Sequence, residues 1–178
     1  MKFYAFILSV AILFTSCSKN EEEAPKSVLP PSVQGQWLRG SFDLKAFWSY
    51  TGTTVQAPAT TDGLQFHADG TVESYTVFFP TDPHQGCTPQ KLLYKKGVAR
   101  FNETNKTFTL EFTEGQYREF YQGCAGKVNV TKTLTAAELN LMTLSGFWKV
   151  EQDGGQTLFG IAYASTGGPY LYLGKSSW

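Results

Sequence analysis

Short runs of strand-forming residues, separated by turn signals, fill most of this 178-residue sequence and constrain its fold more than any other feature. The clearest example is residues 62–79 (DGLQFHADGTVESYTVFF), in which two such runs flank the turn signal Asp69-Gly70. Residues 91–101 and 107–113 flank a polar connection in the same way. The pattern predicts neighbouring antiparallel strands joined by short connections, which is a meander.

Further runs complete the predicted sheet. They lie at residues 34–43, 127–134, 146–152, 157–164 and 169–173. We expect residues 44–50 to continue the first strand past a bend, and residues 135–138 (TAAE) to form either one helical turn or a wide bend. Eight to ten strands without a long helix predict one all-β domain over residues 34–178. A sheet of this size has to close or stack to cover its apolar face and its edges.

The register at Asp69-Gly70 decides which side chains face the core, because a slip of one residue sends each side chain to the other face. A two-residue loop pairs Phe66 with Glu73 and has more apolar matches, but it places the Glu73 carboxylate inside. A three-residue loop with a left-handed Gly70 pairs Phe66 with Val72 instead. Both loops fit the sequence, and the first is the basis of the site predicted below.

A second turn is expected at Glu114-Gly115, between residues 107–113 and 116–123. With a two-residue loop, Glu111 faces Arg118 as an opposite-charge pair, which favours this register. One face of the hairpin then carries apolar and aromatic residues together with one carboxylate. The inward residues predicted from this register are Leu110, Phe112, Tyr117 and Glu119.

The N-terminal segment predicts an exported protein. Residues 1–16 hold Lys2 and an apolar run that is shorter than the roughly 20 residues of a membrane-spanning helix, which is typical of a signal peptide. Small residues then precede Cys17, and this resembles the lipobox of bacterial lipoproteins, in which the cysteine is acylated by chains such as palmitate. Residues 17–33 are polar, acidic and contain proline, which predicts a flexible tether.

Two cysteines are left once Cys17 is set aside. Cys87 and Cys124 are 37 positions apart, and an even pair in an oxidising compartment predicts a disulfide. In the chain-entropy model, a cross-link over such a loop contributes about 4 kcal/mol. A free reactive Cys87 near His84 is the alternative.

Charge and motifs exclude several classes of function. The formal net charge is zero and the longest basic run is Lys95-Lys96, so nucleic acid is not an expected partner. The sequence lacks the common hydrolase, metalloprotease, phosphate-binding and redox motifs, and we predict no enzyme, no cofactor and no metal site. Two alternatives are a metal site at His67 and His84, and a glycosidase-type carboxylate pair of Glu73 and Glu119.

Three features together resemble the lipocalin-like domain of small bacterial lipoproteins. They are Gly35-Gln36-Trp37, the pattern LQFHADGTV, and residues 134–141 (LTAAELNL). The resemblance implies an up-and-down antiparallel β-barrel with an apolar cavity. In lipocalins an arginine after the barrel packs on the tryptophan of the first strand, and only Lys175 is available here. Glu21-Glu22-Glu23 also resembles the export signal of surface-displayed Bacteroidetes-type lipoproteins, which implies an outer-membrane location, on either face of that membrane.

Two functions compete. In the first, a membrane-anchored barrel binds a small hydrophobic molecule among Leu110, Phe112 and Tyr117, with Glu119 and Glu73 as orienting groups. In the second, a surface module binds glycan or protein through exposed aromatic residues such as Trp48, Tyr50 or Tyr172. An internal cavity of at least about 300 Å³ would favour the first function, and a filled core would favour the second.

Overall fold

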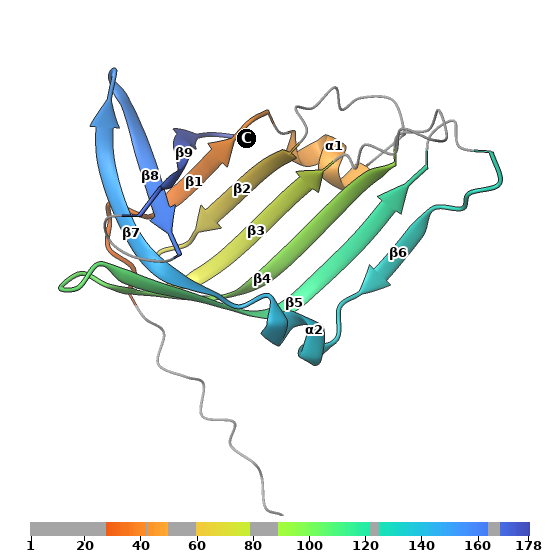
Figure 1. The fold of residues 1–178 in the computed structure, drawn as a ribbon, viewed down its shortest axis with the longest axis horizontal. Helices are drawn as coiled ribbons and strands as arrows, with labels where there is room; N and C mark the ends of the chain where they lie inside the picture. The colour runs from red at the N-terminus through yellow and green to blue at the C-terminus, as the bar shows by residue number, and fades with distance from the viewer. Residues whose placement is uncertain (1–27, 42, 50–59, 79–88, 122–124, 164–167) are drawn as a thin grey trace, which may run out of the picture.

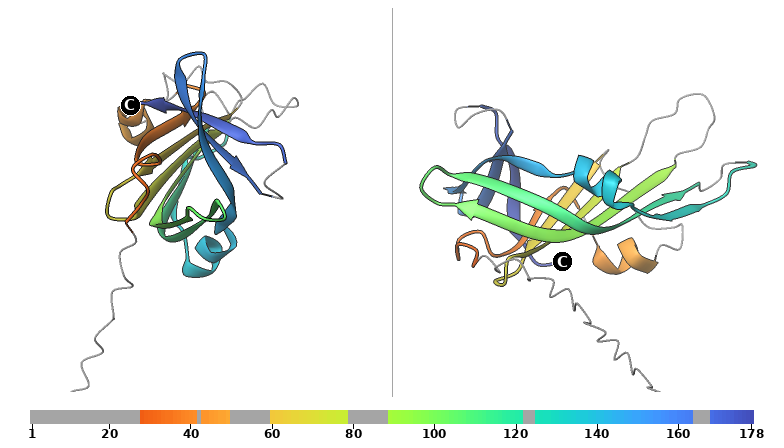
Figure 2. Two further views of the ribbon diagram at one scale, coloured as in Figure 1. Left: turned by 90° about the vertical axis from the view of Figure 1, so that its left-hand side faces the viewer. Right: turned by 90° about the horizontal axis from the view of Figure 1, so that it is seen from below.

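The structure, a computed structural model, describes residues 28–41, 43–49, 60–78, 89–121, 125–163 and 168–178. A single antiparallel sheet of nine strands closes in a ring (Figures 1 and 2). The strands are β1 (Gly35–Arg39), β2 (Thr60–Phe66), β3 (Thr71–Phe78), β4 (Gln90–Asn102), β5 (Thr107–Phe120), β6 (Val130–Thr133), β7 (Leu144–Asp153), β8 (Gln156–Ala162) and β9 (Leu171–Ser176). The described helices are α1 (Leu44–Ser49) and α2 (Ala136–Leu141), each of six residues.

The ring follows the order of the chain. Each strand pairs with the next, and β1 closes the ring against β9. β6 is the exception, because it pairs with the C-terminal half of β5 while the N-terminal half of β5 pairs with β7. The predicted antiparallel meander of eight to ten strands is confirmed.

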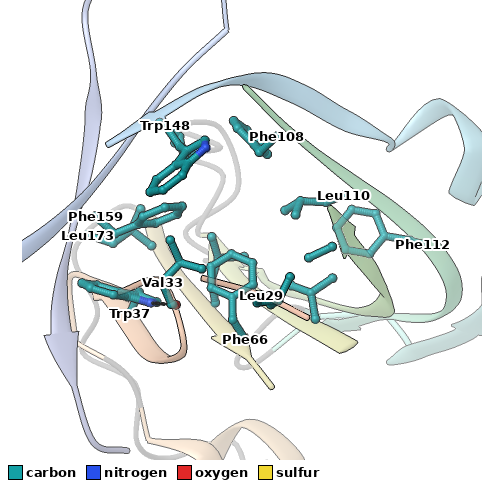
Figure 3. Packing of buried hydrophobic residues seen from close by; sticks show 14 of the residues in the cluster. Leu29, Val33, Trp37, Phe66, Phe108, Leu110, Phe112, Trp148, Phe159 and Leu173 are labelled. Carbon is teal, nitrogen blue, oxygen red and sulfur yellow. Dashed lines mark hydrogen bonds between the residues drawn. The ribbon is translucent and has the colours of Figure 1, made fainter. Parts of the chain in front are cut away.

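Inward side chains of the ring form one apolar core (Figure 3). Trp37, at the centre of β1, is fully buried and packs against Phe159 with ring centroids 5.4 Å apart. Leu29 and Val33 are buried in the same core, and the Trp37 indole Nε1 donates to the Val33 carbonyl at 2.7 Å. Packing therefore begins upstream of Gln34, inside the segment predicted as tether.

The hairpin between β2 and β3 uses the three-residue loop. Phe66 faces Val72, the His67 amide donates to the Thr71 carbonyl at 2.9 Å, and Gly70 is left-handed with a φ of 88°. The two-residue alternative is wrong, because the left-handed Gly70 permits the bulged three-residue loop without a steric cost. As a consequence, Glu73 lies on the outer face of the sheet.

The predicted turn at Glu114-Gly115 is also wrong. β5 runs through this dipeptide, and a β-bulge replaces the turn: Phe112 faces Gly97, while Glu114 faces Lys96, so Thr113 is the extra residue. Gly97 permits the close approach, since a Cβ at this position would lie 1.9 Å from the carbonyl oxygen of the opposing strand. Local turn propensity is overridden by the long pairing of β4 with β5.

The predicted pair of Glu111 and Arg118 does not form. Glu111 instead forms a salt bridge with Arg100 across the β4–β5 ladder. The Arg118 guanidinium donates to the carbonyl oxygens of Phe47 and Trp48 at the end of α1. The opposite charges of Glu111 and Arg118 therefore favoured a wrong register, because Glu111 pairs with Arg100 and Arg118 binds backbone carbonyl oxygens.

Residues 44–49 form helix α1 instead of continuing the first strand. Leu44, Phe47 and Trp48 have the i, i+3, i+4 spacing of one helix face. Phe47 is buried and meets Tyr75 edge-to-face, with ring centroids 5.3 Å apart. α1 therefore covers the outer face of β3 and β4 and creates a second apolar cluster.

Helix α2 bears out the helical alternative for residues 135–138. Thr135 caps it, and Glu138 completes a capping box by accepting from the Thr135 amide at 2.9 Å. Leu134 and Leu139 pack where Gly115 leaves space on β5. None of the helices in the described ranges is long and apolar enough to cross a bilayer.

Candidate functional site

A partly enclosed cavity of about 140 Å³ lies inside the ring, beyond the aromatic core. Its apolar wall consists of Leu64, Leu144, Ile161, Leu171 and Leu173. Its polar lining consists of Asp62, Ser74, Thr76, Lys95 and Tyr163. An apolar wall with a few polar groups is the usual composition of a small-molecule site.

Lys95 is the most unusual residue of this cavity. Its side chain is only 6% exposed, and its ammonium lies 4.1 Å from the centre of the Phe112 ring, a cation–π contact. Burial lowers the pKa of Lys95 to about 8, against a smaller opposing effect of Asp62. At pH 7 roughly nine-tenths of Lys95 is therefore still charged.

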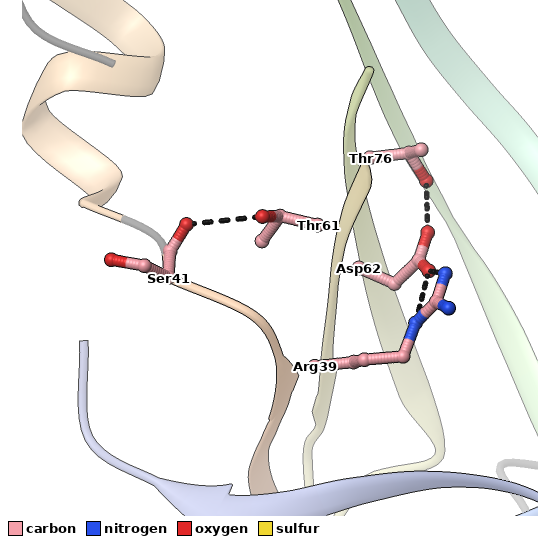
Figure 4. Close-up of polar contacts among 5 residues, drawn as sticks. All are labelled: Arg39, Ser41, Thr61, Asp62 and Thr76. Atoms are coloured by element: carbon pink, nitrogen blue, oxygen red, sulfur yellow. Dashed lines mark hydrogen bonds and ion pairs between the residues drawn. The ribbon is translucent and has the colours of Figure 1, made fainter. Parts of the chain in front are cut away.

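The Asp62 carboxylate is already engaged by other partners (Figure 4). Arg39 donates to it through Nε at 3.0 Å and through Nη2, and the Thr76 hydroxyl donates at 3.2 Å. In the part of the chain that the structure describes, no carboxylate forms an ion pair with Lys95. Arg39 balances Asp62, and the cavity keeps one positive charge in excess.

The alternation of β4 explains why Lys95 points inward. Lys95 shares a sheet face with Leu93, Gly97 and the buried Ala99, whereas Lys96 falls on the outer face. Lys95 was not predicted as a site residue, since Lys95-Lys96 was considered only as a short basic run. The signal that could have revealed it was the period of two along β4.

The five predicted binding residues do not meet in this cavity. Leu110 and Phe112 are buried in the apolar core, and Tyr117 packs against it half-buried. All three lie on the inward face, and Phe112 reaches the cavity only through its contact with Lys95. Glu119 and Glu73 lie elsewhere.

Glu119 sits near the C-terminal end of β5 in a hydrogen-bonded cluster. The hydroxyls of Tyr117 and Tyr121 donate to its two oxygens, and the Lys91 ammonium lies 2.9 Å from Oε1. These contacts, with the Tyr117 bond the strongest, lower the pKa of Glu119 to about 2. With both oxygens occupied, Glu119 connects β4 to β5.

Glu73 lies on the opposite face of the sheet. It accepts from the Tyr75 hydroxyl, and its Oε1 is 3.4 Å from His67 Nε2. Glu73 and Glu119 therefore do not form a carboxylate pair in one cavity. His84 is outside the described residues, and no cluster of three or more metal-ligating side chains occurs in the described ranges.

Among the aromatic residues considered for surface binding, Trp48 is 44% exposed and Tyr172 is half-buried beside Tyr170. Tyr50, Cys17, Cys87 and Cys124 lie outside the described residues, so the lipid anchor and the disulfide remain predictions. Neither known protein families nor curated proteins give a match to this sequence. The function has to be argued from the site itself.

Proposed function

We propose that the ring is a lipocalin-like barrel that binds a small carboxylate with a short apolar chain, and that Cys17 anchors it to a membrane. The carboxylate would lie against the Lys95 ammonium. The chain would contact the leucine-rich wall of the cavity. The single observation that carries this proposal is the buried, unpaired charge of Lys95 inside a partly enclosed cavity.

Charge supports an anionic ligand. A buried ammonium without an ion-pair partner costs several kcal/mol of folding stability, and an anion placed in the cavity would offset part of this cost. The Phe112 ring and the hydroxyl-bearing Ser74 directly across the ladder from Lys95 supply only weak compensation. Asp62 contributes little, because Arg39 and Thr76 already hold it.

Volume limits the size of the ligand. The cavity of about 140 Å³ is smaller than the roughly 300 Å³ at which drug-sized pockets begin. It suits a molecule with a few non-hydrogen atoms, such as a short-chain fatty acid, better than a long lipid. The cavity does not reach the roughly 300 Å³ at which we expected an internal ligand to be favoured, so the proposal is restricted to a short acid.

One contact supports the lipocalin-like assignment. Lys175 of β9 places its ammonium 4.6 Å from the centre of the Trp37 ring of β1 and donates to the Gln34 carbonyl at 2.7 Å. In lipocalins an arginine after the barrel packs on the first-strand tryptophan, and Lys175 makes a comparable contact from within β9. The closed meander is the second supporting feature.

The anchor is tested by cell fractionation. Buried acyl chains contribute about 0.8 kcal/mol per CH₂, so protein acylated at Cys17 should sediment with membranes and Cys17→Ala should be released. Mass spectrometry of the mature N-terminus identifies the acyl group. If the variant still sediments and no acyl group is found, the anchor proposal fails.

Ligand binding is tested by native mass spectrometry of protein purified without detergent, followed by solvent extraction. We expect a carboxylate-containing compound to accompany the wild-type protein and Lys96→Met, which alters the neighbouring outward lysine. Lys95→Met should carry none. Recovery of the same compound from Lys95→Met would exclude the cavity as the binding site.

A further inference from the structure

A groove of about 340 Å³ lies on the outer face of the sheet, between α1 and the C-terminal half of β5. Its floor and walls include Trp48, Tyr94, Glu114, Gln116 and Thr133. It is separate from the interior cavity, which lies inside the ring and shares only strand β4 with the groove. We propose that this groove binds a neutral saccharide, with one sugar ring stacked on Trp48.

Trp48 is exposed and yet fixed in position. Its ring is 44% exposed and meets the Tyr94 ring at 66°, with centroids 4.9 Å apart, so the two rings form a corner. Phe47 supports it edge-to-face at 5.2 Å, and the Arg118 guanidinium lies 5.1 Å from its centre. A rigid, exposed indole loses little conformational entropy when it binds a ligand.

The β-bulge at Thr113 supplies the polar side of the groove. Leu110 and Phe112 face inward, and regular alternation would also turn Glu114 and Gln116 inward. The extra residue reverses the alternation, so both side chains line the outer groove beside Trp48. Bulges commonly redirect side chains toward a functional site in this way.

The chemistry of the groove selects a neutral, hydroxyl-rich ligand. Its polar lining consists of the Glu114 carboxylate, the Gln116 amide and the hydroxyls of Thr113, Thr133 and Tyr94. These groups can accept and donate hydrogen bonds, while an anionic ligand would meet the charge of Glu114. The apolar face of a pyranose ring matches the flat surface of an indole, and its hydroxyl rim matches the polar groups.

The test is a calorimetric titration of the purified domain with neutral hexasaccharides, namely cello-, laminari-, manno-, xylo- and maltohexaose. We expect at least one to bind and its affinity to fall at least tenfold in Trp48→Ala. Gln116→Ala changes a partly exposed side chain, and it should weaken binding several-fold without altering the unfolding midpoint. This second variant keeps the test valid if Trp48→Ala folds poorly.

Two controls separate this groove from the interior cavity. Lys95→Met and Tyr172→Ala should leave saccharide affinity unchanged, and raising NaCl from 50 to 500 mM should have little effect, because a neutral ligand is not screened. Absence of binding by all five hexasaccharides would overturn the proposal. The proposal would also be overturned if saccharide affinity were unchanged in both Trp48→Ala and Gln116→Ala. It would likewise be overturned if the protein bound peptides from a neutral library but bound no saccharide.

Discussion

The Lys175 ammonium lies 4.6 Å from the centre of the Trp37 ring, joining the last strand of the ring to the first. The same ammonium donates to the Gln34 carbonyl at 2.7 Å, just upstream of β1. These two contacts of the Lys175 side chain thus stabilise the pairing of β9 with β1 beside the buried Trp37. We therefore expect a cation at position 175, whether lysine or arginine, to stabilise the closure.

Lys175→Met should lower the free energy of unfolding by about 1 kcal/mol, because it removes an exposed cation–π contact and a charged hydrogen bond. Lys175→Arg should retain most of the stability. Urea unfolding of both variants measures the difference. As a control, Lys127→Met at an exposed position should change stability by less than about 0.5 kcal/mol. Equal effects of Met and Arg at position 175 would contradict the role of the charge.

Gly97→Ala should be among the most destabilising single substitutions and should lower the free energy of unfolding by more than about 4 kcal/mol. The added Cβ would lie 1.9 Å from the Glu111 carbonyl oxygen, so β4 and β5 would have to separate at the bulge. Gly155→Ala is the matched control: its φ is 82°, but no atom lies within 4 Å of the added Cβ. Gly155→Ala should lower the free energy of unfolding by only about 1 kcal/mol, because an alanine is less stable than glycine in a left-handed backbone conformation. Thermal unfolding of the two variants compares them directly.

Glu119→Gln should reduce stability at neutral pH by no more than about 1 kcal/mol, since water screens part of the cluster. The lowered pKa of Glu119 means that the folded state favours the ionised form. The contribution is present above the unfolded pKa and is lost as the pH falls from about 4.5 toward 2. Urea midpoints of wild type and Glu119→Gln should therefore converge in acid. A constant difference down to pH 2 would contradict this account.

The meander was predictable because its signals are local. Turn residues such as Asp69-Gly70 and the alternation of neighbouring strands identify each pairing without knowledge of the rest of the chain. The capping box at Thr135 and Glu138 is equally local. The strands were found from the sequence for this reason, whereas residues 135–138 were predicted as either one helical turn or a wide bend and their capping box was not recognised.

The features that were missed depend on distant partners. α1 is stabilised by Tyr75 and Arg118, which lie 28 and 71 positions from Phe47. The bulge at Thr113 depends on Gly97 in the opposing strand β4. Because of this bulge, Glu114 lies within strand β5 and not in the turn that Glu114-Gly115 had predicted. The alternation of β4 puts Lys95 on one face with Leu93 and Ala99, but only the pairing of β4 with β3 shows that this face points inward. The sign of the interior cavity that could be detected in the sequence was the charged Lys95 among the apolar residues on one face of β4.

Lys95→Met should raise the free energy of unfolding at pH 7 by about 2 to 3 kcal/mol, since it replaces a buried charge by an apolar side chain of similar length. Burial lowers the pKa of Lys95 from 10.5 in the unfolded chain to about 8. Because the unfolded state then binds more protons, wild-type stability should rise as the pH increases from about 8 to 10.5. The advantage of Lys95→Met should shrink over this range, as measured by urea unfolding. The outward Lys96→Met should show no such change.

The central claim is that the Lys95 ammonium binds an anion inside the ring, and calorimetric titration with hexanoate and with 1-hexanol tests it most directly. We expect the wild-type protein and Lys96→Met to bind hexanoate at pH 7 and to bind 1-hexanol at least tenfold more weakly. Hexanoate affinity should fall as the pH rises past 8, where Lys95 loses its proton, and Lys95→Met should abolish the preference for the acid. Equal affinity for acid and alcohol, or hexanoate binding by Lys95→Met that matches the wild type, would contradict the account.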